Sequence, residues 1–393
     1  MNPILIIGAG LAGWTTVREF RKLDPTTPVT MITADSGDFY AKPSLSNAFA
    51  QGRLPAQLIS TPAAKMAETL KVTLLPFTRV NALDCAGKTI TTSTATLAYS
   101  QLVLATGAQP IRVAVAGDAA DQVVSVNSLE DFAAFHARLQ PTHSQHHVLI
   151  MGAGLIGCEF ANDLAQAGYR VSVVDLAARP LMALLPEAAS AALQVALEAL
   201  GVRFHFGTSV RAINSAVERA TPIDPLEILL ANGDVIAASC VLSAIGLRAD
   251  TALAQAAGLT VDRAITVNTR LQTSANDVYA LGDSAQYASA ASPLSAHGLT
   301  LPYVMPIMAA AKVLAANLAG TPCELAFVVM PVSVKTPALP LVVATPKPGT
   351  GGQWNAPEPG LWQWLDEAGL QRGFVLAGAQ TAQRMVQSKL VTQ

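Results

Sequence analysis

Two stretches, "ILIIGAGLAGWTT" at residues 4–16 and "VLIMGAGLIGCEF" at residues 148–160, are nearly identical and occur in different halves of the chain. Each joins an apolar strand-like run to the pattern G-x-G-x-x-G and then to a helix-like run. The amides and the positive end of such a helix can receive a pyrophosphate, and the glycines permit close approach. The copies are too far apart for a solenoid repeat, so the sequence predicts two dinucleotide-binding βαβ domains.

The composition supports a tightly folded protein of two or three domains. The chain has 393 residues, of which 51% are hydrophobic and 13% charged, far from the signature of disorder. A net charge of -2 without a basic block disfavours nucleic acid as a partner. No apolar run approaches the roughly 20 residues that cross a bilayer. The first residues lack a basic leader, so we expect no membrane insertion and a cytoplasmic location.

An acidic residue ends the strand that follows each glycine motif. Asp35 follows "PVTMIT", where Thr33 or Ser36 could share its role of binding a ribose, and Asp175 ends "RVSVVD". A carboxylate at the second site accepts from the 2'-hydroxyl of NADH and repels the 2'-phosphate of NADPH. Arg179 could instead reach a phosphate, but we interpret it as a solvated loop charge, so NADH is favoured.

Shorter patterns predict the remaining elements. Thr61-Pro62 is expected to cap a helix, and Ser128 with Asp131 resembles a capping box. Asn232-Gly233 marks a hairpin. The texture beyond Gly320 is β-like, with a terminal helix near 380–390. Apolar strands that end in glycine turns are expected in "QLVLATG" at 101–107, "CVLSAIG" at 240–246 and "DVYALGD" at 277–283, and further helices at 11–23, 186–200 and 306–318.

The cysteines do not form a redox pair or a metal site in the sequence. Cys85, Cys158, Cys240 and Cys323 are far apart and show no C-x-x-C spacing, so we expect buried reduced thiols and no bound metal. "HSQHH" at residues 143–147 is interpreted as a solvated loop. The last tryptophans are assigned to core packing in preference to a partner surface: Trp354, Trp362 and Trp364.

"GAGLAG", "LATG", "GAGLIGCEF", "AIGLRAD" and "YALGDSA", in this order, resemble the two-dinucleotide flavoprotein reductases that contain glutathione reductase. The resemblance spans nearly the whole chain and implies tightly bound FAD in the first domain and NADH as co-substrate in the second. It also implies that Asp283 hydrogen-bonds the ribityl or pyrophosphate region and that Val80 presents its backbone to the adenine. The expected architecture is α/β: two Rossmann-like domains, for FAD (1–112 and 242–320) and NADH (113–241), and a C-terminal α+β interface domain (321–393).

"YAKPSLSNAF" at residues 40–49 contains no cysteine, which disfavours thiolate chemistry on the flavin. Together with "PVSVKTPALPL" it is similar to the rubredoxin reductases, in which electrons leave singly to a small iron protein. That similarity implies that Lys42 and Glu159 form a charge pair beside the isoalloxazine and that Lys335 approaches the flavin. A cation there stabilises negative charge on the reduced ring. The alternatives are Lys42 as a turn residue and Glu159 as an exposed helix carboxylate.

The expected catalytic residues are Lys42, Glu159 and Lys335. Those expected at FAD are Gly8, Gly10, Leu11, Ala12, Gly13, Thr33, Ala34, Asp35, Lys42, Pro43, Val80, Ala105, Thr106, Gly107, Glu159, Asp283, Lys335 and, at the start of a helix whose positive end faces the flavin, Val304 or Met305. Those expected at NADH are Gly152, Gly154, Leu155, Ile156, Gly157, Asp175 and Gly246.

The leading functional hypothesis is therefore an NADH-dependent FAD enzyme that reduces rubredoxin, for alkane hydroxylation or for disposal of oxygen species. The second is an NADH-dependent ferredoxin reductase of an oxygenase system. A third, from another class, is an NADH-sensing flavoprotein that acts by binding, as apoptosis-inducing-factor-like proteins do. The sequence shows no basic patch in support of the third.

Overall fold

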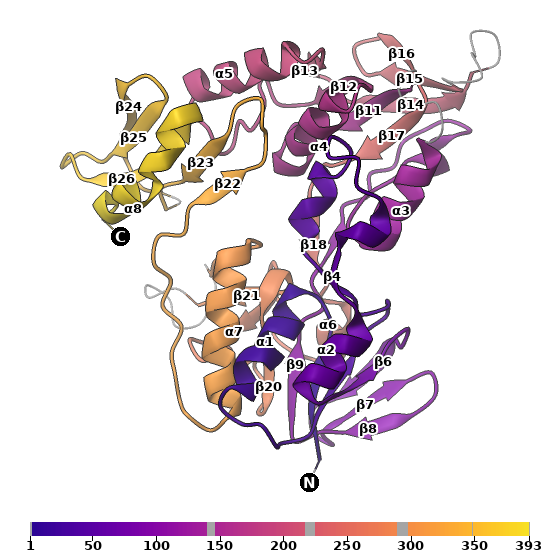
Figure 1. Ribbon diagram of the computed structural model, residues 1–393, viewed down its shortest axis with the longest axis vertical. Coiled ribbons are helices and arrows are strands. Elements are labelled where there is room, and N and C mark those ends of the chain that lie inside the picture. The colour runs from indigo at the N-terminus through magenta and orange to yellow at the C-terminus, as the bar shows by residue number, and fades with distance from the viewer. Residues whose placement is uncertain (1, 140–145, 217–224, 289–297, 348, 393) are drawn as a thin grey trace. The chain divides into compact units, whose positions relative to one another are not determined.

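The computed structural model describes residues 2–139, 146–216, 225–288, 298–347 and 349–392 (Figure 1). The chain folds into two compact units, each assembled from segments far apart in sequence. The first unit comprises Met1–Ala41, Ile59–Gln109 and Leu247–Val328, and the second comprises Lys42–Leu58, Pro110–Gly246 and Val329–Gln393. The segment from Lys42 and the C-terminal segment thus group with the expected NADH domain. The division into three domains stays a prediction.

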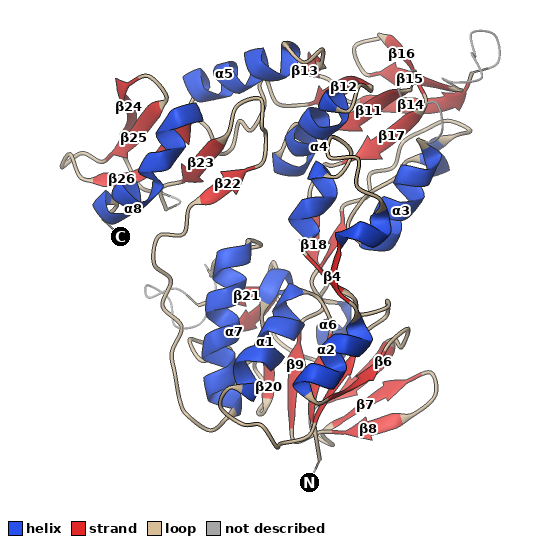
Figure 2. Cartoon of the chain, in the orientation of Figure 1, coloured by secondary structure: helices blue, strands red, loops and turns tan. Residues whose placement is uncertain are grey.

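A five-stranded parallel sheet forms the centre of the first unit, with helices against it (Figure 2). All four residues of strand β1 are buried, as in a parallel strand that is covered on both faces. The sheet order is β20-β9-β1-β2-β5, with strands Val278–Ala280, Gln101–Leu104, Ile4–Ile7, Val29–Ile32 and Val72–Leu75.

Helices α1 and α7 pack side by side in this unit (Figure 1). Trp14 of α1 is fully buried and its Nε1 donates to the carbonyl oxygen of Gly37 at 2.9 Å. The expected cap at Thr61 is wrong: helix α2 begins after Pro62, and the Ala63 amide donates to Asp38 Oδ1 at 2.7 Å. The helices of the unit are α1 (Leu11–Arg21), α2 (Ala63–Leu70), α6 (Ala252–Ala256) and α7 (Val304–Leu318).

Short strands and a 3-10 turn complete the first unit, and one strand pair lies where the chain leaves and re-enters it. The antiparallel sheet β6-β7-β8 comprises Val80–Asp84, Thr89–Thr92 and Thr96–Ala98. The two-stranded pairs are β3 (Phe39–Tyr40) with β4 (Ile59–Thr61), β19 (Ile265–Val267) with β21 (Ala285–Tyr287), and β10 (Ala108–Pro110) with β18 (Leu247–Ala249). The turn η5 (Gly282–Ser284) follows β20.

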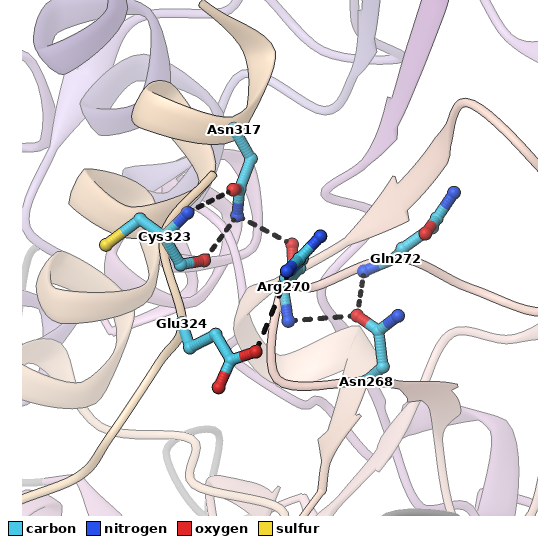
Figure 3. A network of polar contacts seen from close by, with 6 residues as sticks. All are labelled: Asn268, Arg270, Gln272, Asn317, Cys323 and Glu324. Atoms are coloured by element: carbon cyan, nitrogen blue, oxygen red, sulfur yellow. Dashed lines mark hydrogen bonds and ion pairs between the residues drawn. The ribbon is translucent and has the colours of Figure 1, made fainter. Parts of the chain in front are cut away.

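Polar contacts fasten the chain that leaves helix α7 to the body of the first unit (Figure 3). Asn317 Nδ2 donates to the carbonyl oxygens of Arg270, at 3.0 Å, and Cys323, at 2.9 Å. The Cys323 amide returns a bond to Asn317 Oδ1 at 2.8 Å. The charged groups of Arg270 and Glu324 lie 3.8 Å apart. The Leu325 amide donates to the Thr269 carbonyl oxygen at 2.7 Å, and the Phe327 ring lies 5.2 Å from that of Tyr287. The connection therefore stays attached to this unit as far as Phe327.

The second unit contains the other predicted nucleotide fold. Its parallel sheet has the order β13-β12-β11-β17, with strands Arg203–Phe206, Arg170–Asp175, His147–Met151 and Cys240–Ser243. Ser128 accepts from the Asp131 amide at the start of α3, which confirms the capping box. The helices are α3 (Leu129–Arg138), α4 (Leu155–Gln166) and α5 (Glu187–Glu198), and short turns are η1 (Lys42–Asn47), η2 (Pro55–Leu58) and η3 (Ala120–Gln122).

The second unit also contains an antiparallel sheet, β14-β15-β16. The hairpin predicted at Asn232-Gly233 joins β15 to β16 and is confirmed. Its strands are Val210–Ser215, Leu226–Leu230 and Val235–Ala238.

The C-terminal segment forms a separate antiparallel sheet, β22-β23-β26-β25-β24. Its buried core contains Leu361 and Phe374 but none of the three tryptophans, which are only partly buried, so their assignment to the core is wrong. Trp354 and Trp364 instead pack edge to face at 5.4 Å. The elements are β22 (Val332–Val334), β23 (Leu341–Ala344), β24 (Gln353–Glu358), β25 (Leu361–Leu365), β26 (Gln371–Ala377), η6 (Gly378–Gln383) and α8 (Arg384–Leu390).

Two further expectations need correction. Cys158 and Cys240 are buried, but Cys85 is only partly buried and Cys323 is exposed. His147 is the first residue of β11, and its ring contacts the Ala237 carbonyl oxygen at 2.7 Å and Ser172 Oγ at 2.9 Å, so the solvated interpretation is wrong for it. Residues 143–145 lie outside the described residues.

Neither a metal cluster nor a membrane span is found in the part of the chain that the structure describes. No group of three or more His, Cys, Asp or Glu side chains there is arranged to hold a metal ion. No described helix is both long and apolar enough to cross a membrane.

Candidate functional site

The three glycines of the first motif have different surroundings at the β1–α1 turn. A Cβ on Gly8 would lie 2.2 Å from the Ala105 carbonyl oxygen, and one on Gly13 would lie 2.0 Å from the Gly8 carbonyl oxygen. A Cβ on Gly10 would meet nothing within 4 Å. The outer glycines therefore let strand and helix pack closely, and the middle one keeps the space before the helix open, as a pyrophosphate requires.

The amides that start helix α1 are available to such a ligand. Gly10 is the N-cap, no side chain caps the helix, and its first turn contains no acidic residue. Leu11 and Ala12, also predicted to bind FAD, are the first residues of this turn. The arrangement is one in which a helix N-terminus binds phosphate.

The acid predicted at the ribose is held by its own loop. Asp35 Oδ1 accepts from the Thr33 hydroxyl at 2.5 Å and from the Gly37 amide at 3.0 Å. Ala34 and Asp35 are exposed and Thr33 is buried. Ser36, the other alternative, donates to Asp38 Oδ2 at 3.0 Å. The structure thus joins Thr33 to Asp35 and gives Ser36 a different partner.

Other residues predicted at FAD also lie in the first unit. Ala105, Thr106 and Gly107 follow β9, and the Thr106 hydroxyl donates to the Asp250 carbonyl oxygen at 2.8 Å. Asp283 lies in η5 after β20, where a Cβ on the preceding Gly282 would lie 3.0 Å from the Ala12 Cβ. The carboxyl ends of β1, β9 and β20 therefore bring Gly8, Ala105 and the Asp283 turn to one edge, where open α/β sheets bind ligands.

Val80 and the start of helix α7 belong to the same unit. Val80 is the first residue of β6. Val304 and Met305 are the first two residues of α7, with 39% and 49% of their surface exposed. The N-terminus of α7 therefore presents an exposed apolar pair, while Val80 starts a separate antiparallel sheet.

The second motif repeats the first in the second unit. A Cβ on Gly157 would lie 1.9 Å from the Gly152 carbonyl oxygen, and one on Gly152 would lie 2.6 Å from that of Ala244. A Cβ on Gly154 would meet nothing within 4 Å, and no side chain caps α4, which begins with Leu155 and Ile156. This turn meets the same requirements for a pyrophosphate.

Asp175 is positioned directly beside that turn. Its Oδ2 accepts from the Ala153 amide at 2.5 Å and its Oδ1 from the Ala177 amide at 2.6 Å. Arg179 is partly buried and its Nε has no hydrogen-bond partner among the described residues. Its interpretation as a solvated loop charge stays a prediction. Gly246, also predicted at NADH, has a φ of +118° and accepts from the Ile111 amide at 3.0 Å.

One face of helix α4 holds two distant segments by hydrogen bonds. Asp163 accepts from the amides of Phe49, at 3.0 Å, and Ala50, at 2.9 Å. Asn162 Oδ1 accepts from the Ala338 amide at 3.0 Å. The segment that starts at Lys42 and the loop that contains Lys335 are therefore both fixed to α4.

Glu159 contacts both segments at once. Its Oε2 accepts from the Ser46 hydroxyl at 2.7 Å and its Oε1 from the Lys335 amide at 2.9 Å. Burial raises the pKa of Glu159, an effect that these hydrogen bonds and the charge of Lys335 oppose. Burial likewise lowers the pKa of Lys335, against the opposing effect of Glu159. Glu159 is therefore no exposed helix carboxylate.

Lys42 has a different neighbour. Its Nζ donates to Asn127 Oδ1 at 3.2 Å, and the carbonyl oxygen of the adjacent Pro43 accepts from the Ser46 hydroxyl at 3.4 Å. The lysine whose charge lowers the pKa of Glu159 is Lys335. A charge pair between Lys42 and Glu159 stays a prediction.

An aromatic cluster buries the middle of the Lys42 segment. The ring of Phe49 lies 5.4 Å from that of Phe132, 5.5 Å from that of Phe135 and 5.6 Å from that of Tyr169. Ser46, Phe49, Asn162 and Asp163 were not predicted as site residues. The signal was available in "GCEFAND", where three polar residues at positions i, i+3 and i+4 occupy one side of an apolar helix.

Comparisons with known proteins agree with this geometry. The family described as "Pyridine nucleotide-disulphide oxidoreductase" matches residues 2–300, and the one described as "Rubredoxin binding C-terminal domain" matches residues 324–390. A protein named "Rubredoxin-NAD(+) reductase" from Alcanivorax borkumensis is 41% identical, over 99% of this chain and 98% of its own. One of the same name from Acinetobacter baylyi is 42% identical, over 100% and 98%.

A solved structure shows the same fold. The covalent putidaredoxin reductase–putidaredoxin complex contains a chain that superposes with a TM-score of 0.87 at 23% identity, covering 99% of this chain and 93% of that one.

Proposed function

This chain belongs to the pyridine nucleotide-disulphide oxidoreductase family, and from that premise we propose that it is an NADH-dependent FAD enzyme that reduces rubredoxin. The observation that carries the proposal is the rubredoxin-binding match over residues 324–390, because it names the partner. The two rubredoxin reductases that are similar along the whole chain support it.

The reaction balances with one NADH for two carrier molecules. One NADH and two oxidised rubredoxins give NAD⁺, one proton and two reduced rubredoxins. FAD, when bound, supplies the means to take up two electrons as a hydride and to release them singly. Open space before Gly10 and Gly154 and uncapped helix starts fit the two pyrophosphates of FAD and NADH.

The residues of the chain bind and orient the two dinucleotides. Asp35, braced by Thr33, would hold the ribose of FAD, and Asp175 that of NADH. The carboxylate of Asp175 disfavours a 2'-phosphate by charge repulsion. Lys42, Glu159 and Lys335 are the proposed groups at the flavin, where a lysine ammonium would stabilise negative charge.

The cysteines support a cytoplasmic setting for this reaction. All four are free thiols, and thiols remain reduced in the cytosol.

The decisive experiment is stopped-flow reduction of the yellow purified protein by NADH, followed by mixing with oxidised rubredoxin. We expect rapid bleaching of the flavin and then reduction of two rubredoxins per NADH. Ferredoxin in the same assay tests the second hypothesis. A protein that is bleached by NADH but leaves rubredoxin oxidised while it reduces ferredoxin would contradict the proposal.

A further inference from the structure

A small polar pocket of about 250 Å³ opens in the second unit. Its lining combines two cations with three neutral hydrogen-bonding side chains and contains no carboxylate: Ser44, Asn47, Gln51, Arg53 and Lys335. The walls come from the Lys42 segment and from the C-terminal segment. Its chemistry suits an anion.

Neither cation forms an ion pair with a carboxylate in the described part of the chain. No Asp or Glu oxygen there lies within the 4.0 Å ion-pair distance of either charged group. Arg53 Nη2 donates to the Gln57 carbonyl oxygen at 2.5 Å. Glu159 bonds the backbone amide of Lys335. Lys335 feels the charge of Glu159 and is the ammonium proposed at the flavin. Arg53 is therefore the cation of the pocket that favours an external anion.

Both walls of the pocket are fixed to the same helix. Asp163 holds the segment that carries Arg53 through the Phe49 and Ala50 amides, and Glu159 bonds the Lys335 amide. The pocket is therefore held in shape before any ligand arrives, which reduces the entropic cost of binding.

We propose that this pocket receives a surface carboxylate of the electron-carrier protein, an inference that rests on the proposed function. Lys335 lies within the 324–390 match to a rubredoxin-binding domain, and Arg53 lies outside it. An arginine guanidinium suits a carboxylate because it donates two parallel hydrogen bonds. The docking surface thus extends from the C-terminal domain onto the Lys42 segment, and its partner is acidic at the contact.

Charge reversal at Arg53 tests the pocket against a matched control. We compare Arg53→Glu with Arg211→Glu, because Arg211 is exposed on strand β14 of the same unit and does not line the pocket. The KM for rubredoxin should rise about tenfold or more in the first and change little in the second. The dependence of kcat/KM on ionic strength should become shallower only in Arg53→Glu. Arg53→Gln should fall between wild type and Arg53→Glu.

1,4-Benzoquinone, a small uncharged acceptor that needs no protein docking, serves as the internal reference. The rubredoxin rate should fall relative to the benzoquinone rate in Arg53→Glu, with flavin absorbance per protein reporting correct folding. Equal KM values for the two charge-reversed variants would overturn the docking proposal, and so would a parallel loss of both rates. Failure of the proposed function is distinct: unaltered protein would reduce benzoquinone but not rubredoxin.

Discussion

Glu159 and Lys335, separated by 176 positions in sequence, are joined by a 2.9 Å hydrogen bond from the lysine amide to the glutamate carboxylate. The bond attaches the loop of the C-terminal segment to the helix of the second nucleotide motif. The charged group that is proposed to act on the flavin is thus positioned by a residue only two places after Gly157 of that motif.

The carboxylate of Glu159 should make stability depend on pH. Its pKa is raised in the folded protein, so the folded state binds a proton more tightly than the unfolded state. Its contribution is therefore fully present below the ordinary glutamate pKa and is lost as pH rises through the raised folded pKa. In Glu159→Gln this loss should disappear, so that the variant gains stability relative to wild type across that window, as measured by urea unfolding at several pH values. A pH-independent difference would refute this.

The two bonds that Asp163 accepts should protect the Lys42 segment. Asp163→Ala removes an acceptor whose bonds are each worth about 1.5–3 kcal/mol to a charged group. Hydrogen exchange at the Phe49 and Ala50 amides should accelerate about tenfold or more. Asp163→Asn, which keeps one oxygen acceptor, should show a smaller change. Unaltered exchange in the alanine variant would mean that the aromatic cluster around Phe49 is sufficient to protect these amides.

The first glycine motif offers a matched pair of substitutions. Gly10→Ala places its Cβ in open space and should cost less than about 1 kcal/mol of stability, yet leave the protein deficient in FAD. Gly13→Ala forces a Cβ to within 2.0 Å of the Gly8 carbonyl oxygen and should cost at least about 2 kcal/mol. Urea unfolding of flavin-free protein and flavin absorbance separate the two effects. A Gly10→Ala protein that keeps its full yellow colour would argue against this phosphate site.

Asp175 should decide between NADH and NADPH. Asp175→Asn keeps an oxygen for one of the Ala153 and Ala177 amides but removes the charge that repels a 2'-phosphate. The ratio of kcat/KM for NADH to that for NADPH should fall about tenfold, which corresponds to about 1.4 kcal/mol. Steady-state kinetics with both coenzymes measure it. An unchanged ratio would mean that another residue discriminates between the two coenzymes, and Arg179 would be the next to test.

Local signals explain what the sequence predicted well. The strand, glycine turn and helix of each motif, the capping box at Ser128 and the hairpin at Asn232 are all encoded within a few neighbouring residues. These elements depend on backbone geometry and on side chains three or four places away, so a linear reading contains the required information.

Long-range contacts explain what the sequence could not predict. The amides that bond to Asp163 lie 113 and 114 positions away, and the helix cap at Ala63 comes from Asp38 instead of the adjacent Thr61. Such partners are determined by tertiary packing, which local propensity does not contain. Likewise, the apolar pattern of "LWQWL" predicts core residues, but its two tryptophans are only partly buried.

The tie between Asn317 and Cys323 has a practical meaning for protein engineering. Because both partners, and the chain as far as Val328, belong to the unit that contains the first glycine motif, a chimera that exchanges the C-terminal segment for that of another reductase should be spliced after Val328. A junction upstream of Cys323 would replace the residue to which Asn317 is hydrogen-bonded and would so remove these contacts from the first unit.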